Sequence, residues 1–495
     1  MITATKADFE KEASALSLET RAFIGGKYID SVSGKTFETY NPGNGNLLAR
    51  VAECGAEDVD LAVKAARRAF ESGCWSKMEP RERKKILLKF ADLIEQHAEE
   101  LSVLEVLDCG KPISDARSVD VPDSIETLRW HAEMTDKMYD QLVPTGPDNV
   151  SMVVREPIGV VGGVLPWNYP IFCGMWKLAP ALAGGNSVVL KPAELTPLTM
   201  IRRAALAAEA GIPEGVFNVV PGMGETAGQA LGVHMDVDCV SFTGSGEVGR
   251  MFLQYSAQSN LKKIVLEMGG KSPAIVMDDA MDLEYVATGI LFCQGENCSA
   301  GSRLIVQKNI KEEFLSLLID AMKRWVVGDP LDPSTNIGAL IEEKHFHRVM
   351  NYIGKGDREG ASRILGGEQV LPESGGYYIG PTVFDNVNRD MTIVREEIFG
   401  PVLAVLPFDT AEEAVTIAND TSYGLASSLY TQDLTLAHKM SRAIRAGTVS
   451  VNCFSEGDFA SPFGGFKQSG FGGRDKGAAA HEQYLETKSI WMQLR

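Results

Sequence analysis

A glycine-rich turn at Gly244–Gly249 has a spacing that could bind a phosphate group. It reads GSGEVG, which matches the pattern GxGxxG, and it follows an apolar run, Asp238–Phe242, and precedes a helical pattern that opens near Glu247. Glycines let a backbone approach a ligand closely, and the N-terminus of a helix favours phosphate. The turn predicts a dinucleotide site, although a tight glycine turn without a ligand explains the same residues equally well. In this fingerprint a later acid, here Glu267, would hold the ribose.

Six further segments carry chemistry-bearing residues in a fixed order. They are PWNYP (166–170), KPAE (191–194), LEMGGKSP (266–273), QGENCSAGSR (294–303), EEIFGPV (396–402) and SPFGGFKQSG (461–470). Together they resemble the aldehyde dehydrogenase superfamily from roughly residue 20 to the C-terminus, and in particular its betaine-aldehyde and aminoaldehyde branch. Any one segment could arise by chance, but six in the family's order could not.

The resemblance implies an α/β fold with three parts. A Rossmann-like NAD-binding domain would comprise 1–141 and 157–266, and an α/β catalytic domain would comprise 267–460. A small β oligomerisation flap would combine 142–156 with 480–495, where a hairpin pairs with the last strand. The flap in turn implies a homodimer or a homotetramer.

The resemblance also assigns catalytic roles to Cys298, Asn168 and Glu267. A thiolate adds readily to a carbonyl carbon and later leaves the acyl group, so Cys298 would carry first a thiohemiacetal and then a thioester. The Asn168 amide would donate a hydrogen bond to the developing oxyanion. Glu267 would remove a proton from the water that hydrolyses the thioester. This role replaces the ribose role, because the family provides another acid, Glu194, for the ribose.

The implied coenzyme is NAD, with NADP as a weaker alternative. Lys191 and Glu194 would bind the adenosine ribose, where a carboxylate accepts a hydrogen bond from a 2′-hydroxyl but repels a 2′-phosphate. The other expected coenzyme contacts are Trp167, Gly244, Ser245, Glu397 and Phe399. No metal is expected, because none of the cysteines lies in a CxxC or Cys/His spacing typical of zinc.

Two departures from the family pattern concern the substrate. Glu296 stands where relatives often have Gln, and the interval from Glu267 to Cys298 is a few residues shorter than in many relatives, which should alter the substrate tunnel. A carboxylate near the nucleophile attracts cations, and aromatic faces attract quaternary ammonium groups. The sequence therefore favours an aminoaldehyde or betaine aldehyde, with a neutral aliphatic or aromatic aldehyde as the alternative. The expected substrate contacts are Tyr169, Trp176, Glu296 and Phe463, with acidic Asp120 and Asp123 in the helix at the entrance.

Two other functions remain open alternatives. A CoA-acylating semialdehyde dehydrogenase forms the same thioester but transfers the acyl group to CoA; such relatives usually lack an acid equivalent to Glu267. A catalytically silent binding protein could share the fold, although intact Cys298, Glu267 and Asn168 argue against it.

The elements that must position these residues alternate in type. Apolar runs separated by helical patterns predict βαβ units and a parallel sheet. The expected strands are 159–165, 187–190, 216–220, 238–242 and 263–266, and in a second series 274–276, 303–306, 402–407 and 448–451. Helices are expected over about 59–107 and 121–138, over 197–210 and near 225–231, after a loose polar lead-in at 1–20.

Composition limits the class of protein. The chain has 495 residues, 44% hydrophobic and 23% charged, which fits a globular enzyme of more than one domain. Its net charge of −18 argues against a nucleic-acid partner and weakly against anionic lipid. Eight scattered cysteines, no apolar signal core and no long apolar stretch predict a cytoplasmic protein without a membrane span.

Overall fold

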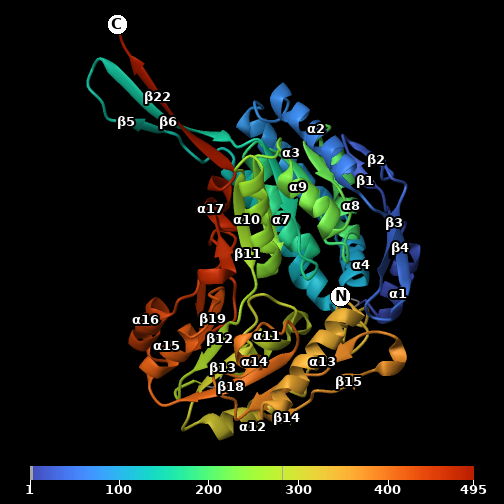
Figure 1. Ribbon diagram of the computed structural model, residues 1–495, viewed down its shortest axis with the longest axis vertical. Helices are drawn as coiled ribbons and strands as arrows, with labels where there is room; N and C mark the ends of the chain where they lie inside the picture. Colours follow the sequence, from blue (N-terminus) through green and yellow to red (C-terminus); the bar gives the residue numbers. More distant parts are fainter. Residues whose placement is uncertain (1–3, 281) are drawn as a thin grey trace.

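The computed structural model describes residues 4–280 and 282–495, and its strands form two large sheets, one projecting sheet and two small pairs (Figure 1). The first large sheet, in the upper body of Figure 1, has the order β2-β1-β9-β8-β7-β10-β11-β21. Its central strands are parallel: β9 (Phe217–Val219), β8 (Ser187–Lys191), β7 (Val160–Val164), β10 (Cys239–Gly244) and β11 (Lys263–Met268). The antiparallel edge strands are β1 (Ala22–Ile24), β2 (Lys27–Ile29) and β21 (Gly470–Phe471).

Helices cover both faces of this sheet, which explains why its central strands are almost entirely apolar. Val160 and Val189 face one layer of helices, whereas Val161 and Val188 face the other. The first layer is α2 (Ala56–Ser72), α9 (Gln229–Val233) and α10 (Gly246–Gln258). The second is α3 (Pro80–Gln96), α4 (Ala98–Cys109), α6 (Val121–Met134), α7 (Pro170–Ala183) and α8 (Leu198–Ala210).

The second large sheet forms the lower body of Figure 1 and has the order β14-β17-β18-β13-β12-β19-β20. All neighbours except β14 and β17 are parallel. The strands are β12 (Pro273–Val276), β13 (Arg303–Gln307), β14 (Ser362–Leu365), β17 (Thr382–Asp385), β18 (Val402–Phe408), β19 (Ala426–Tyr430) and β20 (Thr448–Val451). One face packs on α11 (Leu283–Leu291) and α12 (Lys311–Met322), and the other on α13 (Glu343–Arg358), α14 (Thr392–Arg395), α15 (Ala411–Asn419) and α16 (Leu434–Ala443).

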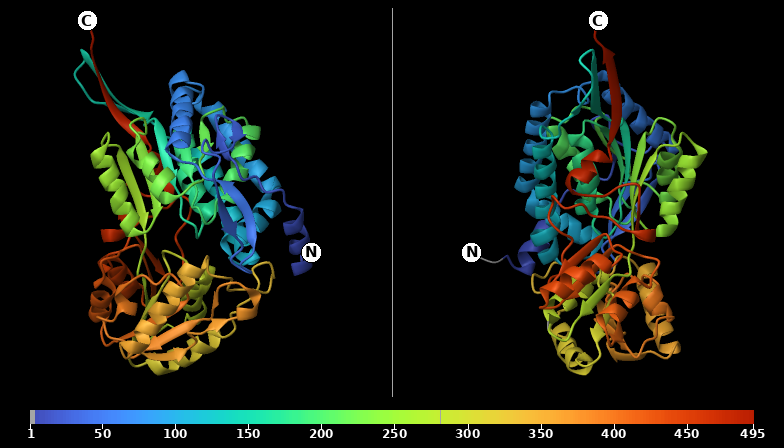
Figure 2. Two further views of the ribbon diagram at one scale, coloured as in Figure 1. Left: turned by 45° about the vertical axis from the view of Figure 1, so that its right-hand side comes forward. Right: turned by 90° about the vertical axis from the view of Figure 1, so that its left-hand side faces the viewer.

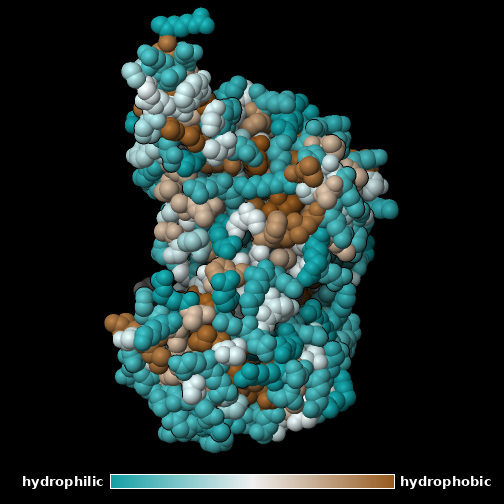
Figure 3. Space-filling view, turned by 60° about the vertical axis from the view of Figure 1, so that its left-hand side comes forward, coloured by the Kyte–Doolittle hydropathy of each residue, from teal (hydrophilic) through white to brown (hydrophobic). Residues whose placement is uncertain are grey.

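A three-stranded antiparallel sheet projects from the body and carries the C-terminus (Figure 2). It contains β5 (Gln141–Val143), β6 (Asn149–Pro157) and β22 (Leu485–Gln493), which follows α17 (Gly477–Glu482). The expected pairing of the hairpin with the last strand is confirmed. In the space-filling view of Figure 3 the projection carries hydrophobic patches between hydrophilic ones. Its exposed apolar residues include Leu142 and Trp491.

The expected alternation of strands and helices is confirmed, but the N-terminal part of the prediction was wrong in detail. The lead-in contains α1 (Lys6–Ala15), which begins with a capping box between Thr5 and Asp8 and buries Phe9. The strands β1 and β2 were not expected, nor was the antiparallel pair β3 (Thr36–Tyr40) and β4 (Leu47–Ala52). Strands of three residues, such as β1 and β2, are too short for a periodic pattern to identify them.

The long helical span expected over about 59–107 is three helices, α2, α3 and α4. Gly73 ends α2 in the left-handed conformation, and a second break at His97 separates α3 from α4. A short helix α5 (Ile113–Asp115) and one π-helical turn at 116–120 precede α6, which ends at Met134. The remaining strands, β15 (Gln369–Val370) and β16 (Tyr378–Ile379), form a small pair.

Candidate active site

A cavity of about 1210 Å³ lies between the two bodies. The first sheet contributes the residues that follow β7, β8, β10 and β11, and the second body contributes segments around 297, 344 and 397. Parallel strands bind ligands at their carboxyl ends, so the fold itself brings these residues together. Of the residues predicted from sequence, the cavity wall contains Trp167, Asn168, Tyr169, Trp176, Lys191, Glu194, Gly244, Ser245, Glu267, Cys298, Glu397 and Phe399.

A strained turn presents Cys298 to this cavity. Cys293 and Gln294 have positive φ angles of 51° and 46°, and Gly295 follows with 74°. A Cβ on Gly295 would lie 2.3 Å from the carbonyl carbon of Gly400, so only glycine fits there. Two left-handed non-glycine residues cost of order 1–3 kcal/mol each, and the packing around the turn must offset this cost. As a result Cys293 is buried, whereas Cys298 lies on the cavity wall.

The surroundings of Cys298 favour the neutral thiol. Burial raises its pKa well above the ordinary value, and the nearby carboxyl groups of Glu456 and Glu267 raise it further. A thiol in such a place becomes nucleophilic only when a base takes its proton.

Glu267 lies in β11, close to the end of that strand, with its carboxyl group buried. Its Oε1 has no hydrogen-bond partner among the residues that the structure describes. Burial raises the pKa of the carboxyl well above its usual range, and the negative charge of Asp475 adds to the effect. A carboxylate with a raised pKa is a stronger base once it is ionised, so the site favours proton transfer.

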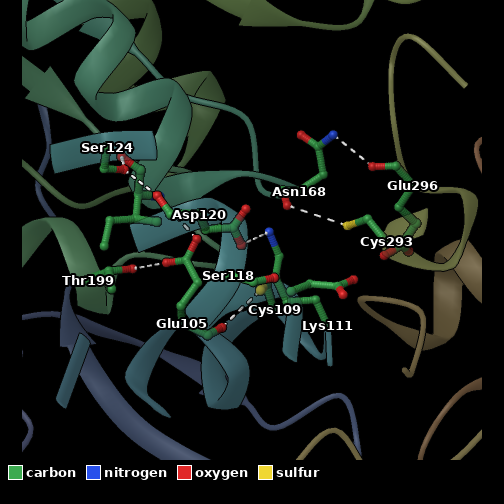
Figure 4. Close-up of polar contacts among 12 residues, drawn as sticks. Glu105, Cys109, Lys111, Ser118, Asp120, Ser124, Asn168, Thr199, Cys293 and Glu296 are labelled. Carbon is green, nitrogen blue, oxygen red and sulfur yellow. Dashed lines mark hydrogen bonds and ion pairs between the residues drawn. The ribbon is translucent and has the colours of Figure 1, made fainter. Parts of the chain in front are cut away.

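Asn168 lies in the loop between β7 and α7 (Figure 4). Its side chain points toward the turn at 293–296 that precedes Cys298, which we call the nucleophile turn. The Nδ2 group donates a hydrogen bond of 2.8 Å to the carbonyl oxygen of Glu296. The Cys293 thiol lies 3.9 Å from the carbonyl oxygen of Asn168. A primary amide has two N–H donors, and this bond uses one of them.

Residues expected to bind a dinucleotide lie along the other part of the wall. At the end of β8, the Lys191 ammonium pairs with Glu194 at 2.9 Å. Ser245 caps α10, and its hydroxyl accepts a hydrogen bond from the Val248 amide. Glu397 accepts a hydrogen bond of 3.0 Å from the Gly270 amide.

Burial and one aromatic contact complete this region. Burial raises the pKa of Glu397 to about 7. The rings of Trp167 and Phe399 meet edge to face with 5.2 Å between centroids.

Three of the acidic and aromatic residues expected to contact the substrate lie elsewhere. Glu296 is buried behind the cavity wall, where its carboxyl accepts hydrogen bonds from the Ile341 amide and from Gln294. Burial raises the pKa of Glu296 to about 8, and both of its carboxyl oxygens are occupied by hydrogen bonds from the protein. Phe463 is fully buried behind Trp176, with 5.0 Å between ring centroids. Asp120 is fully buried in an ion pair with Lys111. These three residues are not among those that line the cavity, and their contact with the substrate stays a prediction.

Asp123, in α6, does lie on the wall, and burial raises its pKa to about 6. Sequence reasoning missed the segment 454–459, which follows β20 and also lines the cavity. Its Glu456 accepts a hydrogen bond of 2.5 Å from the Ser299 hydroxyl, and the Lys476 ammonium donates to the Glu456 carbonyl oxygen at 2.8 Å. A sequence pattern could have identified this segment, because the acidic and aromatic run FSEGDF (454–459) closely follows a strand of a parallel sheet.

The wall is otherwise rich in aromatic side chains. Beside Tyr169 and Trp176 it contains Phe172, Phe292, Phe454 and Phe459. The Lys476 ammonium lies over the Trp176 ring at 5.4 Å from its centroid. Within residues 4–280 and 282–495, no helix is long and apolar enough to cross a membrane, and no cluster of His, Cys, Asp or Glu is arranged to hold a metal ion.

Comparison with known proteins agrees with this geometry. The model of the aldehyde dehydrogenase family matches residues 28–490. The chain is 52% identical to aminoacetaldehyde dehydrogenase of Pseudomonas aeruginosa, over 99% of this chain and 98% of the relative. It is 46% identical to the NADP/NAD-dependent aldehyde dehydrogenase PuuC of Escherichia coli, over 98% of both chains. A crystal structure of an indole-3-acetaldehyde dehydrogenase in complex with NAD+ superposes with a TM-score of 0.98 and 53% identity, covering 99% of this chain and 100% of that one.

The chain therefore belongs to the aldehyde dehydrogenase family. It is an NAD(P)-dependent aldehyde dehydrogenase, as the sequence motifs predicted.

Proposed function

We propose that the protein oxidises an aldehyde to a carboxylic acid through a thioester on Cys298. The observation that carries this proposal is a single cavity wall that contains Cys298, Glu267 and Asn168. The Cys298 sulfur adds to the aldehyde carbon once its proton is removed. The second N–H of Asn168 donates to the oxygen that becomes negative. After the carbon has lost a hydride, Glu267 removes a proton from the water that hydrolyses the thioester.

NAD is the proposed coenzyme, and the residues of the first body fit it. At Gly249 a Cβ would lie 2.5 Å from the Met268 sulfur, so this glycine lets α10 pack closely on β11, as the dinucleotide fingerprint requires. The partially positive N-terminus of α10 would face the pyrophosphate. Lys191 and Glu194 would hold the adenosine ribose. When bound, NAD supplies the acceptor for the hydride.

The preference for NAD over NADP rests on Glu194. Its side chain lies on the cavity wall and is 39% exposed, with one oxygen paired to Lys191. A carboxylate there accepts a hydrogen bond from a 2′-hydroxyl and repels a 2′-phosphate. The Escherichia coli relative is described as using both coenzymes, so we expect weaker but measurable NADP activity.

The proposed substrates are aminoaldehydes, with betaine aldehyde in the same class. Asp123 and Glu456 place carboxyl groups on the substrate part of the wall, and the aromatic side chains beside them can stabilise an ammonium group by about 0.5–2 kcal/mol each. The relative in Pseudomonas aeruginosa is named for aminoacetaldehyde. A neutral aromatic aldehyde is the alternative, favoured by the same aromatic wall and by the relative named for indole-3-acetaldehyde.

The test compares kcat/KM for 4-aminobutyraldehyde, betaine aldehyde, hexanal and indole-3-acetaldehyde, each with NAD. A cation preference should fall in Asp123→Asn and stay unchanged in Glu126→Gln, a control on the exposed side of the same helix. Better turnover of hexanal than of both cations would sink the substrate proposal but leave the reaction intact. Stimulation of product formation by CoA would revive the acyl-CoA alternative.

We also propose that the parts of the chain have the roles expected from the sequence. The first body would bind the coenzyme, the second would carry the nucleophile, and the projecting sheet would join subunits of a homodimer or homotetramer. Leu142, Trp491 and Leu494 on that sheet are 74%, 65% and 50% exposed, which is unusual for large apolar side chains unless a partner covers them. Light scattering after size-exclusion chromatography tests this assembly, and a monomer at micromolar concentration contradicts it.

A further inference from the structure

Glu296 connects three separate parts of the site. It lies two residues before Cys298, and its side chain is only 1% exposed. One carboxyl oxygen accepts a hydrogen bond of 3.0 Å from the Ile341 amide, and the other accepts one of 3.0 Å from the Gln294 side chain. The His345 ring lies 3.5 Å from the first oxygen.

The backbone of the same residue bonds to the turn that precedes Cys298 and to the side chain of Asn168. The Glu296 amide donates to the Cys293 carbonyl oxygen at 2.8 Å, which closes the strained turn before Cys298. The Glu296 carbonyl oxygen accepts the hydrogen bond from the Asn168 side chain (Figure 4). The position of Asn168 therefore depends on where this peptide unit lies.

The segment that bonds to the carboxyl group is itself held by backbone hydrogen bonds on two sides. Ile341 ends a short segment in which the Ala339 amide donates to the Gly110 carbonyl oxygen and the Leu340 amide donates to the Tyr377 carbonyl oxygen. The segment is thus bonded both to the first body and to the loop before β16. The hydrogen bond from Ile341 to the Glu296 carboxyl group therefore connects the nucleophile turn to the segment at 339–341.

We infer that Glu296 is a positioning residue for the proposed reaction: its carboxyl group fixes the nucleophile turn and, through its own carbonyl oxygen, the oxyanion-binding amide of Asn168. The inference rests on the proposed roles of Cys298 and Asn168. Glu296 itself does not touch the aldehyde.

The hydrogen-bond chemistry explains how a glutamine would fit the same place. The Ile341 and Gln294 groups that bond to Glu296 are donors, so the carboxyl group serves them with two acceptor oxygens. A glutamine offers one acceptor and one donor. Within the described part of the chain the Oε1 atom of Gln294 has no hydrogen-bond partner, so rotation of the Gln294 amide would let this oxygen accept a hydrogen bond from the new amide. Leucine at this position offers neither.

The experiment compares Glu296→Gln and Glu296→Leu with Glu343→Gln, an exposed control on neighbouring α13. A misplacement of about 1 Å can cost on the order of 100-fold in rate. We expect Glu296→Leu to lower kcat by about 30- to 300-fold on that basis, equally for 4-aminobutyraldehyde and hexanal. The Kd for NAD, measured by tryptophan fluorescence, should stay within about twofold, and Glu296→Gln should recover kcat to within about threefold.

Several results would overturn the inference. One is a normal kcat in Glu296→Leu. Another is a fall in kcat that occurs only with 4-aminobutyraldehyde and that Glu296→Leu and Glu296→Gln share. That result would mean that the charge of Glu296 attracts the substrate. If Glu296→Leu does not fold, Gln294→Met is tested instead, because it removes one hydrogen-bond donor to the Glu296 carboxyl group. This variant should have a lower kcat and an unchanged Kd for NAD. A normal kcat would refute the inference. Absence of NADH formation by the unmodified enzyme with every aldehyde would instead refute the proposed function.

Discussion

The amide of Asn168 gives the sharpest quantitative test of the site. Replacing it by alanine removes one preorganised donor to the oxyanion, and such a donor contributes ~2.7–4 kcal/mol to transition-state stabilisation. We therefore expect Asn168→Ala to lower kcat by about 100- to 1000-fold. The fall should appear in the first turnover, measured as NADH formation by stopped flow with enzyme in excess, because the donor acts before the hydride leaves.

The same substitution should also affect stability. It leaves the buried carbonyl oxygen of Glu296 without its hydrogen bond of 2.8 Å. An unsatisfied buried acceptor costs about 1–3 kcal/mol, so the free energy of unfolding in urea should fall by that amount.

A matched control separates the two effects. Asn186 is fully buried, and its side-chain nitrogen donates to the carbonyl oxygens of Ala181 and Tyr484, remote from the cavity wall. Asn186→Ala should lose stability without a comparable loss of single-turnover rate. The reasoning is refuted if both variants lose the same rate, or if Asn168→Ala slows the first turnover by less than about tenfold.

Three further predictions concern the other groups of the site. Cys298→Ala should abolish turnover, while NAD binding measured by fluorescence persists. In the unmodified enzyme, the rate of Cys298 alkylation should still increase above pH 9, because the pKa of the thiol is raised and the reactive thiolate increases with pH. An alkylation rate that stops increasing near neutral pH would contradict the raised pKa of Cys298. Glu267→Gln should release one burst of NADH per active site and then stall at deacylation, and normal steady-state turnover would mean that another base exists. Glu194→Gln should raise the ratio of kcat/KM for NADP to that for NAD, since it removes the charge that repels a 2′-phosphate; an unchanged ratio contradicts the ribose assignment.

The sequence was sufficient to predict the parallel strands β7 to β13, β18 and β20 and several residues of the cavity wall at their ends. Runs such as those around Val161 and Val189 are apolar without alternation, because helices cover both faces of the strands they form. Lys191 is the last residue of one such strand, and Ser245 directly follows another. In a parallel sheet the carboxyl ends of neighbouring strands lie at one edge, so residues at these positions converge whatever the details of packing.

The sequence could not predict which way side chains point after an irregular turn. Glu296 is close to Cys298 in the chain, yet it faces the junction at Ile341 rather than the substrate, because Cys293, Gln294 and Gly295 all have positive φ angles. That conformation depends on the contact between Gly295 and the backbone of Gly400, which is remote in sequence.

The proposed reactive groups, the order of the apolar runs that form strands, and the glycine turn of the proposed coenzyme site were thus present in the sequence itself. The tertiary structure decided which acids face the cavity. Asp120 forms a buried ion pair with Lys111, and Glu296 is buried behind the wall, whereas Glu456, which follows β20 in the chain, lines the cavity. The physical reason is that burial and pairing of a carboxyl group are determined by residues far apart in the chain, whereas the periodicity of a strand is determined by its immediate neighbours.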